Sequence, residues 1–525
     1  MRADDVVLDC VMGAALAGAY AAQMVRWLRV LQREHYEPTS MRRFLGRWSS
    51  PQVASAKSPE RTKAKRPVTL SHVLIFLLVV AVAVHNDLFI VLVTALYGLL
   101  CPQGLSLRGR TGALRWTRRL YVTAGLATFI SVAVGVAGLF SVRPWLAFVA
   151  MVWGVPLILE VTTRLLAPYE RRHSQTFVDQ AVARLARVRP RVVAITGSYG
   201  KTSTKNHLAE LLSGEAGVVA SPRSFNNRSG LSRAINENLA DDSRIFIAEM
   251  GTYGPGEIAE LCSWCPPELA VVTAIGPVHL ERMRSLDVIE RAKYEITAPA
   301  RVVVLNVDDA RLACWVDRLE ERGKRVRTAG SSTNSASVRV YDQDARWHVS
   351  VEGEDVGSLE LVTGLQATNL ACAVAAALEV GASVQEVVAR LDFVVPVANR
   401  ANVAQAPSGV MVIDDTFNAN PASARAAISM LAKLRVPGRK FVVTPGLIEL
   451  GATQFEENFA VATEVRSVGA GLVVVGRTNA RALSRGYAGP VERFDTRDQA
   501  VAWVRSSLVR GDGVLYLNDL PDHYP

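Results

Sequence analysis

The chain has 525 residues, of which 50% are hydrophobic and 21% charged, and its formal net charge is +10. This length corresponds to about three or four ordinary domains, which excludes a single small module, and six cysteines over this length exclude a disulfide scaffold. The mean hydropathy of +0.18 is high, so either the core is very large or part of the chain lies in lipid.

Long uncharged runs are concentrated in the first third of the chain. A membrane-spanning helix needs about 20 mainly apolar residues, and several segments come near that length. The candidate spans are residues 6–25, 68–84, 88–100, 120–140 and 145–166. We therefore predict a helical membrane region over residues 1–170 with about five transmembrane helices.

Basic residues in the loops between these runs predict an orientation. The linker 26–67 and the loop 108–119 are rich in Arg and Lys, whereas the turns around 85–87 and 143 carry almost no charge. Because basic loops stay on the cytoplasmic side, we expect a multi-pass plasma-membrane protein with an external N-terminus and cytoplasmic catalytic domains. Nucleic acid is the alternative partner for such loops, but aromatic residues are not interleaved with the charges in a way that would suggest base stacking. Setting of topology and attraction to the lipid bilayer are therefore the favoured roles.

From residue 191 onwards, short β-branched runs alternate with helical stretches, which indicates an α/β domain with a largely parallel sheet. The apolar run 191–196 leads into a glycine-rich turn and then a helical pattern. Backbone N–H groups at such a turn can surround a phosphate, a Lys can add positive charge and a Thr hydroxyl can hold Mg²⁺. The predicted nucleotide site comprises Gly197, Ser198, Tyr199, Gly200, Lys201, Thr202 and Ser203.

The glycine spacing narrows the class of nucleotide-binding protein. Two residues separate Gly197 from Gly200, whereas the common phosphate loop has four between its glycines. Ordinary GTPases and transport ATPases are therefore disfavoured.

Further motifs follow this turn in a fixed order. They are SFNNRSG at 224–230, IAEMGTYGPGEI at 247–258, VVTAIGPVHLE at 271–281, RAKYEI at 291–296, LNVDD at 305–309 and VIDDTFNANPASARAA at 412–427. In this order the chain resembles the Mur ligase family, and most of all the branch that adds D-alanyl-D-alanine during peptidoglycan assembly. The resemblance implies a phosphate-loop central domain over 171–395 and a smaller Rossmann-like C-terminal domain over 396–525.

The resemblance also implies the reaction. ATP would activate a carboxylate as an acyl phosphate, and an amine would then attack it to form an amide, with charge neutralised at each stage. Lys201 would contact the β- and γ-phosphates, and Thr202 would hold Mg²⁺. Glu249 follows an apolar strand-like run, so its carboxylate lies at the end of a strand where α/β sheets bind ligands, and it is the second expected Mg²⁺ ligand.

Two further residues complete the expected catalytic set with Lys201. By resemblance, His279 would hold a second Mg²⁺ bound to the acyl phosphate. Lys293 matches a Lys that is carbamylated in much of the family and would then be a metal ligand; an unmodified surface Lys is the alternative.

The remaining expected contacts come from the resemblance alone. Asn306, Arg400 and Asp415 would meet the nucleotide. Asn226, Asn227, Asn418 and Asn420 would line the substrate side. The C-terminal residues would complete the site only when that domain closes over ATP, which protects an acyl phosphate from water.

One departure from the family changes the expected substrate. The usual N-terminal domain that holds a uridine diphosphate sugar is missing, which favours a precursor held at the membrane. An inactive ATP-binding scaffold is the main alternative, but it would be expected to have lost Lys201, Glu249 or His279. An ATP-driven transporter would need more polar residues in its spans than Asp9 and Glu160.

Cys262 and Cys265 form a lone CxxC, for which ordinary helix-end cysteines are favoured over structural zinc.

Overall fold

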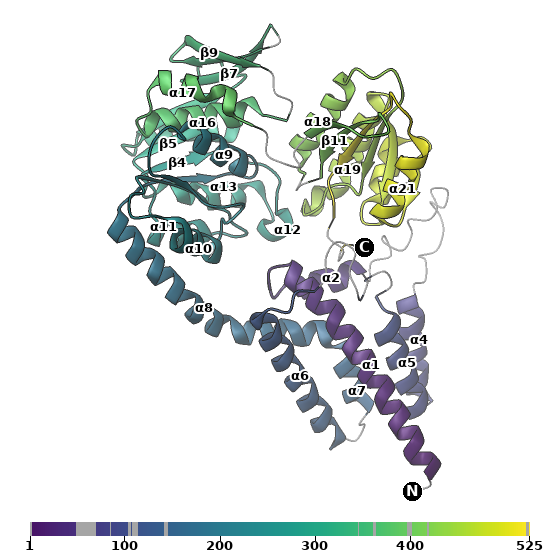
Figure 1. Cartoon of the computed structure of the whole chain (residues 1–525). Coiled ribbons are helices and arrows are strands. Elements are labelled where there is room, and N and C mark those ends of the chain that lie inside the picture. Colours follow the sequence, from purple (N-terminus) through teal and green to yellow (C-terminus); the bar gives the residue numbers. More distant parts are fainter. Residues whose placement is uncertain are drawn as a thin grey trace.

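The computed structural model describes residues 3–48, 70–84, 86–102, 105, 107, 114–140, 145–344, 346–360, 364–395, 402–416, 419–520 and 524. Figure 1 shows a helical region below two α/β domains, with the long helix α8 running from the helices to the middle domain. Two predicted site residues, Arg400 and Asn418, lie outside the described residues.

The helical region is a packed bundle. Its helices are α1 (Ala3–Arg33), α2 (Ser40–Trp48), α4 (Leu70–Ala83), α5 (Asp87–Leu100), α6 (Arg118–Leu139), α7 (Trp145–Trp153) and α8 (Val155–Val188). Trp27 and Leu31 of α1 are buried in one core with Phe44 of α2 and Leu159 of α8. The second half of α1 therefore faces protein on several sides.

Polar side chains of α1 complete the C-terminal end of α5. The Arg26 guanidinium donates hydrogen bonds to the carbonyl oxygens of Gly98 at 2.7 Å and Leu105 at 3.1 Å, and Gln23 donates to that of Cys101 at 2.6 Å. Gly98 lies in the last turn of α5, whose carbonyls have no partner within the helix, and Cys101 and Leu105 lie in the chain after that helix. These bonds fix α1 against α5.

The prediction of five membrane spans is wrong. In the part of the chain that the structure describes, only the helix segment Arg118–Gly138 is long and apolar enough to cross a membrane. The pair α7 and α8 could add one more, but it is bent by 73° at its break. Helices α4 and α5 have 14 residues each, about 21 Å, against a hydrocarbon core of about 30 Å.

The physical reason lies in tertiary packing, which hydropathy along the sequence does not register. Within the predicted span 6–25, Leu16 and Ala19 pack against Ala95 of α5 and Val152 of α7, and Met24 belongs to the core around Phe44 of α2. The same helix buries Gln23 and Arg26. The predicted multi-pass plasma-membrane localisation and external N-terminus both depended on the five spans. Both predictions therefore lose their support.

The middle domain is built on a mostly parallel sheet with the strand order β2-β3-β1-β4-β5-β6-β7-β8-β9. The bounds are β1 Arg191–Thr196, β2 Val218–Ala220, β3 Ile245–Glu249, β4 Leu269–Val272, β5 Val302–Asn306, β6 Arg325–Gly330, β7 Val338–Gln343, β8 Arg346–Val351 and β9 Glu354–Glu360. The pairings from β2 to β7 are parallel, and β8 is antiparallel to both of its neighbours. In the register of β1 with β3, Ile195 lies opposite Glu249, which brings the phosphate loop and Glu249 to one edge of the sheet.

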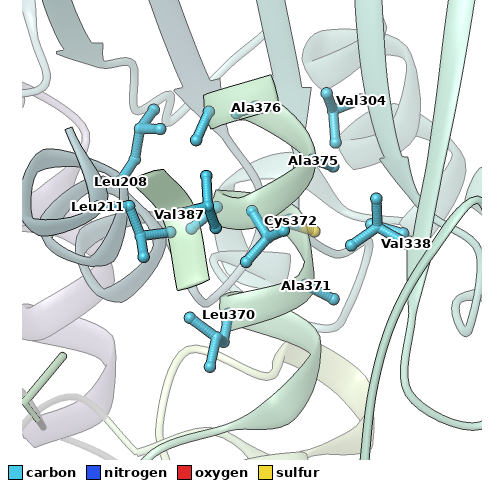
Figure 2. Packing of buried hydrophobic residues seen from close by; sticks show 14 of the residues in the cluster. Leu208, Leu211, Val304, Val338, Leu370, Ala371, Cys372, Ala375, Ala376 and Val387 are labelled. Carbon is cyan, nitrogen blue, oxygen red and sulfur yellow. The ribbon is translucent and has the colours of Figure 1, made fainter. Parts of the chain in front are cut away.

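Helices cover both faces of this sheet. They are α9 (Lys201–Leu211), α10 (Arg228–Asn238), α11 (Glu257–Trp264), α12 (Leu280–Met283), α13 (Leu286–Tyr294), η1 (Glu295–Thr297), α14 (Ala310–Ala313), α15 (Trp315–Glu320), α16 (Ala367–Glu379), α17 (Val384–Arg390) and η2 (Leu391–Phe393). The helix α16 is rich in Ala and buried from Asn369 to Ala377. In Figure 2 its side chains lie between Leu208 and Leu211 of α9 on one side and Val338 of the sheet on the other. Small side chains let α16 approach both neighbours closely.

The C-terminal domain has a second sheet, with the strand order β10-β11-β15-β12-β13-β14. The strands are β10 Asn402–Gln405, β11 Met411–Asp415, β12 Lys440–Thr444, β13 Gly471–Val475, β14 Glu492–Phe494 and β15 Gly513–Leu517. The helical elements are α18 Pro421–Lys433, η3 Gly451–Thr453, α19 Gln454–Ser467, α20 Ala480–Tyr487 and α21 Arg497–Ser507. All pairings are parallel except that of β10 with β11.

The α/β fold with mostly parallel sheets was predicted correctly. The expected boundary between residues 170 and 171 falls inside α8, which runs without a break from Val155 to Val188. Val155 is part of the helical core, whereas Ala181 is part of the middle-domain core, so one helix belongs to both.

Candidate active site

The glycine-rich loop connects β1 to α9 in a conformation that needs glycine. Gly200 has a φ of +83°, in the left-handed region, and a Cβ there would clash with the side chain of Asn369. Gly200 is also the N-cap of α9, so the first backbone N–H groups of the helix follow it directly. Free N–H groups at a helix N-terminus are a binding site for an anion such as phosphate.

The residues between the glycines tie this loop to the turn after β4. The Ser198 hydroxyl donates to the Gly276 carbonyl at 3.0 Å and accepts from the Gly276 N–H at 2.9 Å. Burial raises the pKa of Tyr199 to about 12, so its phenol is neutral at physiological pH. The Lys201 ammonium donates to the Gly197 carbonyl at 2.7 Å, which keeps it beside the loop. Ser203 is buried on the inner face of α9.

Glu249 is the centre of a buried polar cluster beside this loop. It ends β3, and one carboxylate oxygen accepts from the Thr202 hydroxyl at 3.0 Å. The other oxygen accepts from the Asn226 side-chain amide at 3.0 Å. The predicted pair Thr202 and Glu249 is thus brought together with the predicted substrate residue Asn226.

Lys205 belongs to the same cluster but was not predicted from the sequence. Its ammonium lies 3.3 Å from the Glu249 carboxylate and also donates to the Arg223 carbonyl. Burial lowers the pKa of Lys205, and the Glu249 charge opposes that shift. Lys205 follows Thr202 by three positions on α9, and this spacing on one helix face is the signal that could have identified it.

The donor set fits Mg²⁺. Within the described residues, no group of three or more His, Cys, Asp or Glu side chains could hold a metal ion by itself. Mg²⁺ at nucleotide sites takes one or two protein oxygens and completes its shell with phosphates and water. The Thr202 hydroxyl and the Glu249 carboxylate, next to the helix N-terminus, supply such a pair.

His279 lies at the interface with the C-terminal domain. Its backbone is left-handed, with a φ of +54°, and its Nδ1 hydrogen-bonds to the carboxylate of Glu449. Burial would raise the pKa of Glu449, but the hydrogen bond and charge of His279 together with the charge of Arg282 lower it to about 2. Glu449 lies 170 positions from His279 in the sequence and was not among the predicted site residues.

Lys293 lies on α13 and is buried. Burial and, second, the positive charge of Lys201 lower its pKa well below the ordinary value for a lysine. The alternative of an exposed surface lysine is therefore wrong.

Several residues predicted to contact ligands form structural hydrogen bonds within the protein. The Asn306 amide donates to the Thr273 carbonyl at 2.9 Å and so supports the turn beneath the phosphate loop. Asn227 caps α10 by accepting from the Gly230 N–H at 2.9 Å. Asn420 caps α18 in the same way and is buried. Caps of this kind are a frequent use of Asn.

Asp415 ends β11 and is buried at the C-terminal edge of the second sheet. Its backbone carbonyl accepts from the Asn518 N–H at 2.9 Å.

Cys262 is buried near Met250, and burial raises the pKa of its thiol to about 12, which disfavours the thiolate that zinc binds.

Comparison with known proteins agrees with this geometry. Residues 195–377 match the Mur ligase middle domain, and residues 399–517 match the Mur ligase, glutamate ligase domain. The UDP-N-acetylmuramoyl-tripeptide--D-alanyl-D-alanine ligase of Mycobacterium leprae (strain TN) is 35% identical over 365 residues, which cover 62% of this chain and 70% of that protein. The corresponding ligase of Mycobacterium tuberculosis (strain ATCC 25618 / H37Rv) is also 35% identical, but the match covers only 57% of this chain and 61% of that protein.

Solved structures share the fold. A MurF ligase from Thermotoga maritima in complex with ADP has a TM-score of 0.57 and 25% identity, covering 66% of this chain and 80% of that one. A MurF structure from Acinetobacter baumannii has a TM-score of 0.57 and 23% identity over 66% of this chain and 77% of that one. With both family domains matched in order, and a relative 35% identical over 70% of its length, the chain belongs to the Mur ligase family of amide-forming ligases that use ATP with Mg²⁺.

Proposed function

We propose that this ligase joins an amino acid or dipeptide to the peptide carboxylate of a cell-wall precursor through an acyl phosphate. The observation that carries this proposal is the Thr202–Glu249 oxygen pair, 3.0 Å apart, beside the free N-terminus of α9. This arrangement supports an anion site and a Mg²⁺ site next to each other at the carboxyl edge of the sheet.

In this proposal the phosphates lie against the N–H groups of the loop and the start of α9. Lys201 exchanges its contact with the Gly197 carbonyl for the β- and γ-phosphates, where negative charge develops. When Mg²⁺ is held by Thr202 and Glu249, it neutralises phosphate charge during transfer. Asn226 holds Glu249 in place for that task.

The nucleotide and substrate contacts of the other predicted residues stay proposals. Asn306, Arg400 and Asp415 are proposed to meet the nucleotide, and Asn227, Asn418 and Asn420 the substrate side. Arg400 and Asn418 lie outside the described residues. For Asn227, Asn306 and Asn420, the capping and support bonds described above would have to coexist with ligand contact.

His279 and a carbamylated Lys293 are proposed as ligands of a second Mg²⁺ at the acyl phosphate. The resemblance to the family supplies this proposal, and the burial of Lys293 on α13 supports it. His279 contributes from the loop that faces the C-terminal domain, so its ligation would accompany rearrangement of the Glu449 contact.

For the acceptor, we propose a lipid-linked precursor presented at a bilayer surface. The relatives described above are named as ligases of a UDP-N-acetylmuramoyl tripeptide, but neither matched family domain includes the helical region of this chain. Helix α6 has exposed apolar side chains, including Tyr121, Phe129 and Val132, which supports contact with lipid. This contact does not require several membrane crossings.

A two-acceptor assay tests the proposal. The full chain is incubated with ATP, Mg²⁺ and D-alanyl-D-alanine, together with either the uridine diphosphate muramoyl tripeptide or the same tripeptide on a lipid diphosphate in detergent. We expect a dipeptide mass increment and phosphate release with the lipid-linked acceptor. No increment with either acceptor would reject the assigned reaction, and faster turnover of the soluble acceptor would reject the lipid-linked one.

An inactive scaffold is disfavoured by the same cluster. A chain that only binds its partners has no need to keep Lys201, Thr202 and Glu249 at the end of two adjacent strands.

A further inference from the structure

We infer that Glu34, in the corner between α1 and α2 (residues 34–39), is a positioning residue of the active site: it holds Arg282, and through Arg282 and Tyr253 it orients His279. This inference rests on the proposed role of His279 and deepens it. It assigns a function in the ligase reaction to the helical region, which neither matched family domain includes.

The first step is a buried ion pair between the corner and the middle domain. The Glu34 carboxylate lies 3.0 Å from the guanidinium of Arg282, on α12, and 2.7 Å from that of Arg43, on α2. Only 6% of the Glu34 side chain and 12% of the Arg282 side chain are exposed. Solvent and salt screen such a pair weakly, and removal of one partner leaves a buried charge uncompensated.

The second step leads from Arg282 to His279. The Arg282 guanidinium lies over the ring of Tyr253, 4.6 Å from its centroid. The Tyr253 ring in turn packs edge-on against the His279 imidazole, with the centroids 4.8 Å apart. Arg282 and His279 are also joined by the backbone, because the Arg282 N–H donates to the His279 carbonyl at 2.9 Å.

The corner also contacts this ring stack directly. The His35 ring lies 6.3 Å from that of Tyr253. His35 and Tyr36 both have left-handed backbones, with φ of +55° and +62°. Non-glycine residues keep this conformation only where surrounding contacts impose it, and Arg119 stacks over the Tyr36 ring at 3.8 Å.

The C-terminal domain reaches the same place from the other side. Glu449 bonds to His279, and its neighbour Ile448 packs against the helical core formed around Phe44. Tyr524 packs edge-on against Phe44, with the ring centroids 5.1 Å apart. The helical region therefore contacts Arg282, three residues after His279, and also Ile448, the residue before the Glu449 that bonds to His279.

The test compares Glu34→Gln with Glu37→Gln. Both residues lie in the corner and both face Arg43, but Glu37 lies 3.8 Å from Arg43, and its ion pairs do not include Arg282. We expect Glu34→Gln to lower kcat about tenfold or more, as loss of a group that orients a ligand does, with KM for ATP within twofold of wild type. Glu37→Gln should keep both values within twofold.

A spectroscopic measurement separates this inference from the proposed reaction. In protein labelled with ¹³C-histidine, the His279 resonance is assigned from its absence in His279→Gln. We expect it to shift in Glu34→Gln and not in Glu37→Gln, whether or not the acceptor has been identified. If the wild type forms no amide but the resonance shifts, the proposed function fails and the positioning role stands.

Two results would overturn the inference: an unchanged His279 resonance in folded Glu34→Gln, or wild-type kcat in that variant. Because Glu34→Gln leaves the guanidinium groups of Arg43 and Arg282 facing each other, melting curves accompany each measurement. If that variant is unfolded, Glu34→Gln combined with Arg43→Gln restores the net charge of the cluster and removes the facing guanidinium, while Arg282 still loses Glu34. The same kcat loss and resonance shift are expected in the double variant.

Discussion

At the scale of single residues, the site depends on charges held out of water. Glu249 and Lys205 are both buried, and each has hydrogen bonds besides their ion pair. A buried pair adds little stability over apolar residues of the same size, but loss of one partner is costly. Such a pair therefore fixes the position of the Glu249 carboxylate more than it stabilises the fold.

Replacement of Lys205 tests this arrangement. Lys205→Met leaves Glu249 buried without its cation, so we expect the free energy of unfolding to fall by about 3 kcal/mol. Circular dichroism melting should show a lower transition temperature. The double variant Lys205→Met with Glu249→Gln should regain part of the loss, because it buries no unpaired charge. Equal or greater loss in the double variant would contradict this account.

Lys201 provides the test of the phosphate loop. Lys201→Ala should lower ATP-dependent amide formation by at least about 100-fold, because its charge acts where phosphate charge develops. Phosphate release is the measurement. The matched control is Lys433→Ala, at the exposed end of α18, which should keep full turnover. Normal turnover in Lys201→Ala would remove Lys201 from the proposed site.

His207 on α9 gives a prediction about pH. Burial lowers its pKa from 6.5 to about 4, so the folded state holds it neutral where the unfolded chain protonates it. The stability it contributes is therefore complete above about pH 6.5 and is lost as pH falls towards 4, at up to about 1.4 kcal/mol per pH unit. Between pH 7.5 and 4.5, the melting temperature of the wild type should fall relative to that of His207→Leu as pH falls. Parallel curves would show that His207 contributes nothing.

At the scale of elements, local patterns predicted what depends on neighbouring residues. The strand, glycine turn and helix around Lys201 form one continuous segment, and that segment was predicted correctly in type and position. Glu249 was also predictable, because it directly follows an apolar strand. Lys205 was missed although its helical spacing from Thr202 was visible in the sequence.

Features that depend on distant segments could not be obtained in this way. The contact of Glu449 with His279 joins residues 170 positions apart, and that of Glu34 with Arg282 joins residues 248 apart. The membrane prediction failed for a related reason. Hydropathy counts apolar residues, but whether they face lipid or another helix is decided by packing.

The helix α16 shows how closely one element is fitted to its neighbours (Figure 2). We expect Ala376→Leu, in the fully buried part of α16, to destabilise the middle domain by about 1 to 3 kcal/mol through overpacking. The control is Ala426→Leu at an exposed position of α18, which should change stability little. Thermal melting of both variants is the measurement, and an unchanged transition for Ala376→Leu would show that α16 is loosely packed.

At the scale of the whole molecule, binding of nucleotide and catalysis should be separable. The phosphate loop, Glu249 and Lys205 all lie in the middle domain, whereas the helical region contacts the His279 loop. A fragment of residues 171–525 should therefore bind ATP with Mg²⁺ within about threefold of the full chain but form amide at least about tenfold more slowly. Calorimetry and mass spectrometry measure the two properties. A fragment with full ligase activity would show that the helical region is dispensable.

The single helix α8 has a mechanical consequence. With 34 residues it is about 51 Å long, and near its C-terminal end Arg184 donates to the Leu239 carbonyl at 2.6 Å, next to α10. The helix α8 thus joins the helical region to the middle domain. The contact of Tyr524 with Phe44 joins the helical region to the C-terminal domain. The contact of Glu449 with His279 joins the two catalytic domains. The three parts form a closed linkage. Because the three parts are joined in a ring, the C-terminal domain can move away from His279 only if its contacts with the helical core through Tyr524 and Ile448 release or if α8 bends.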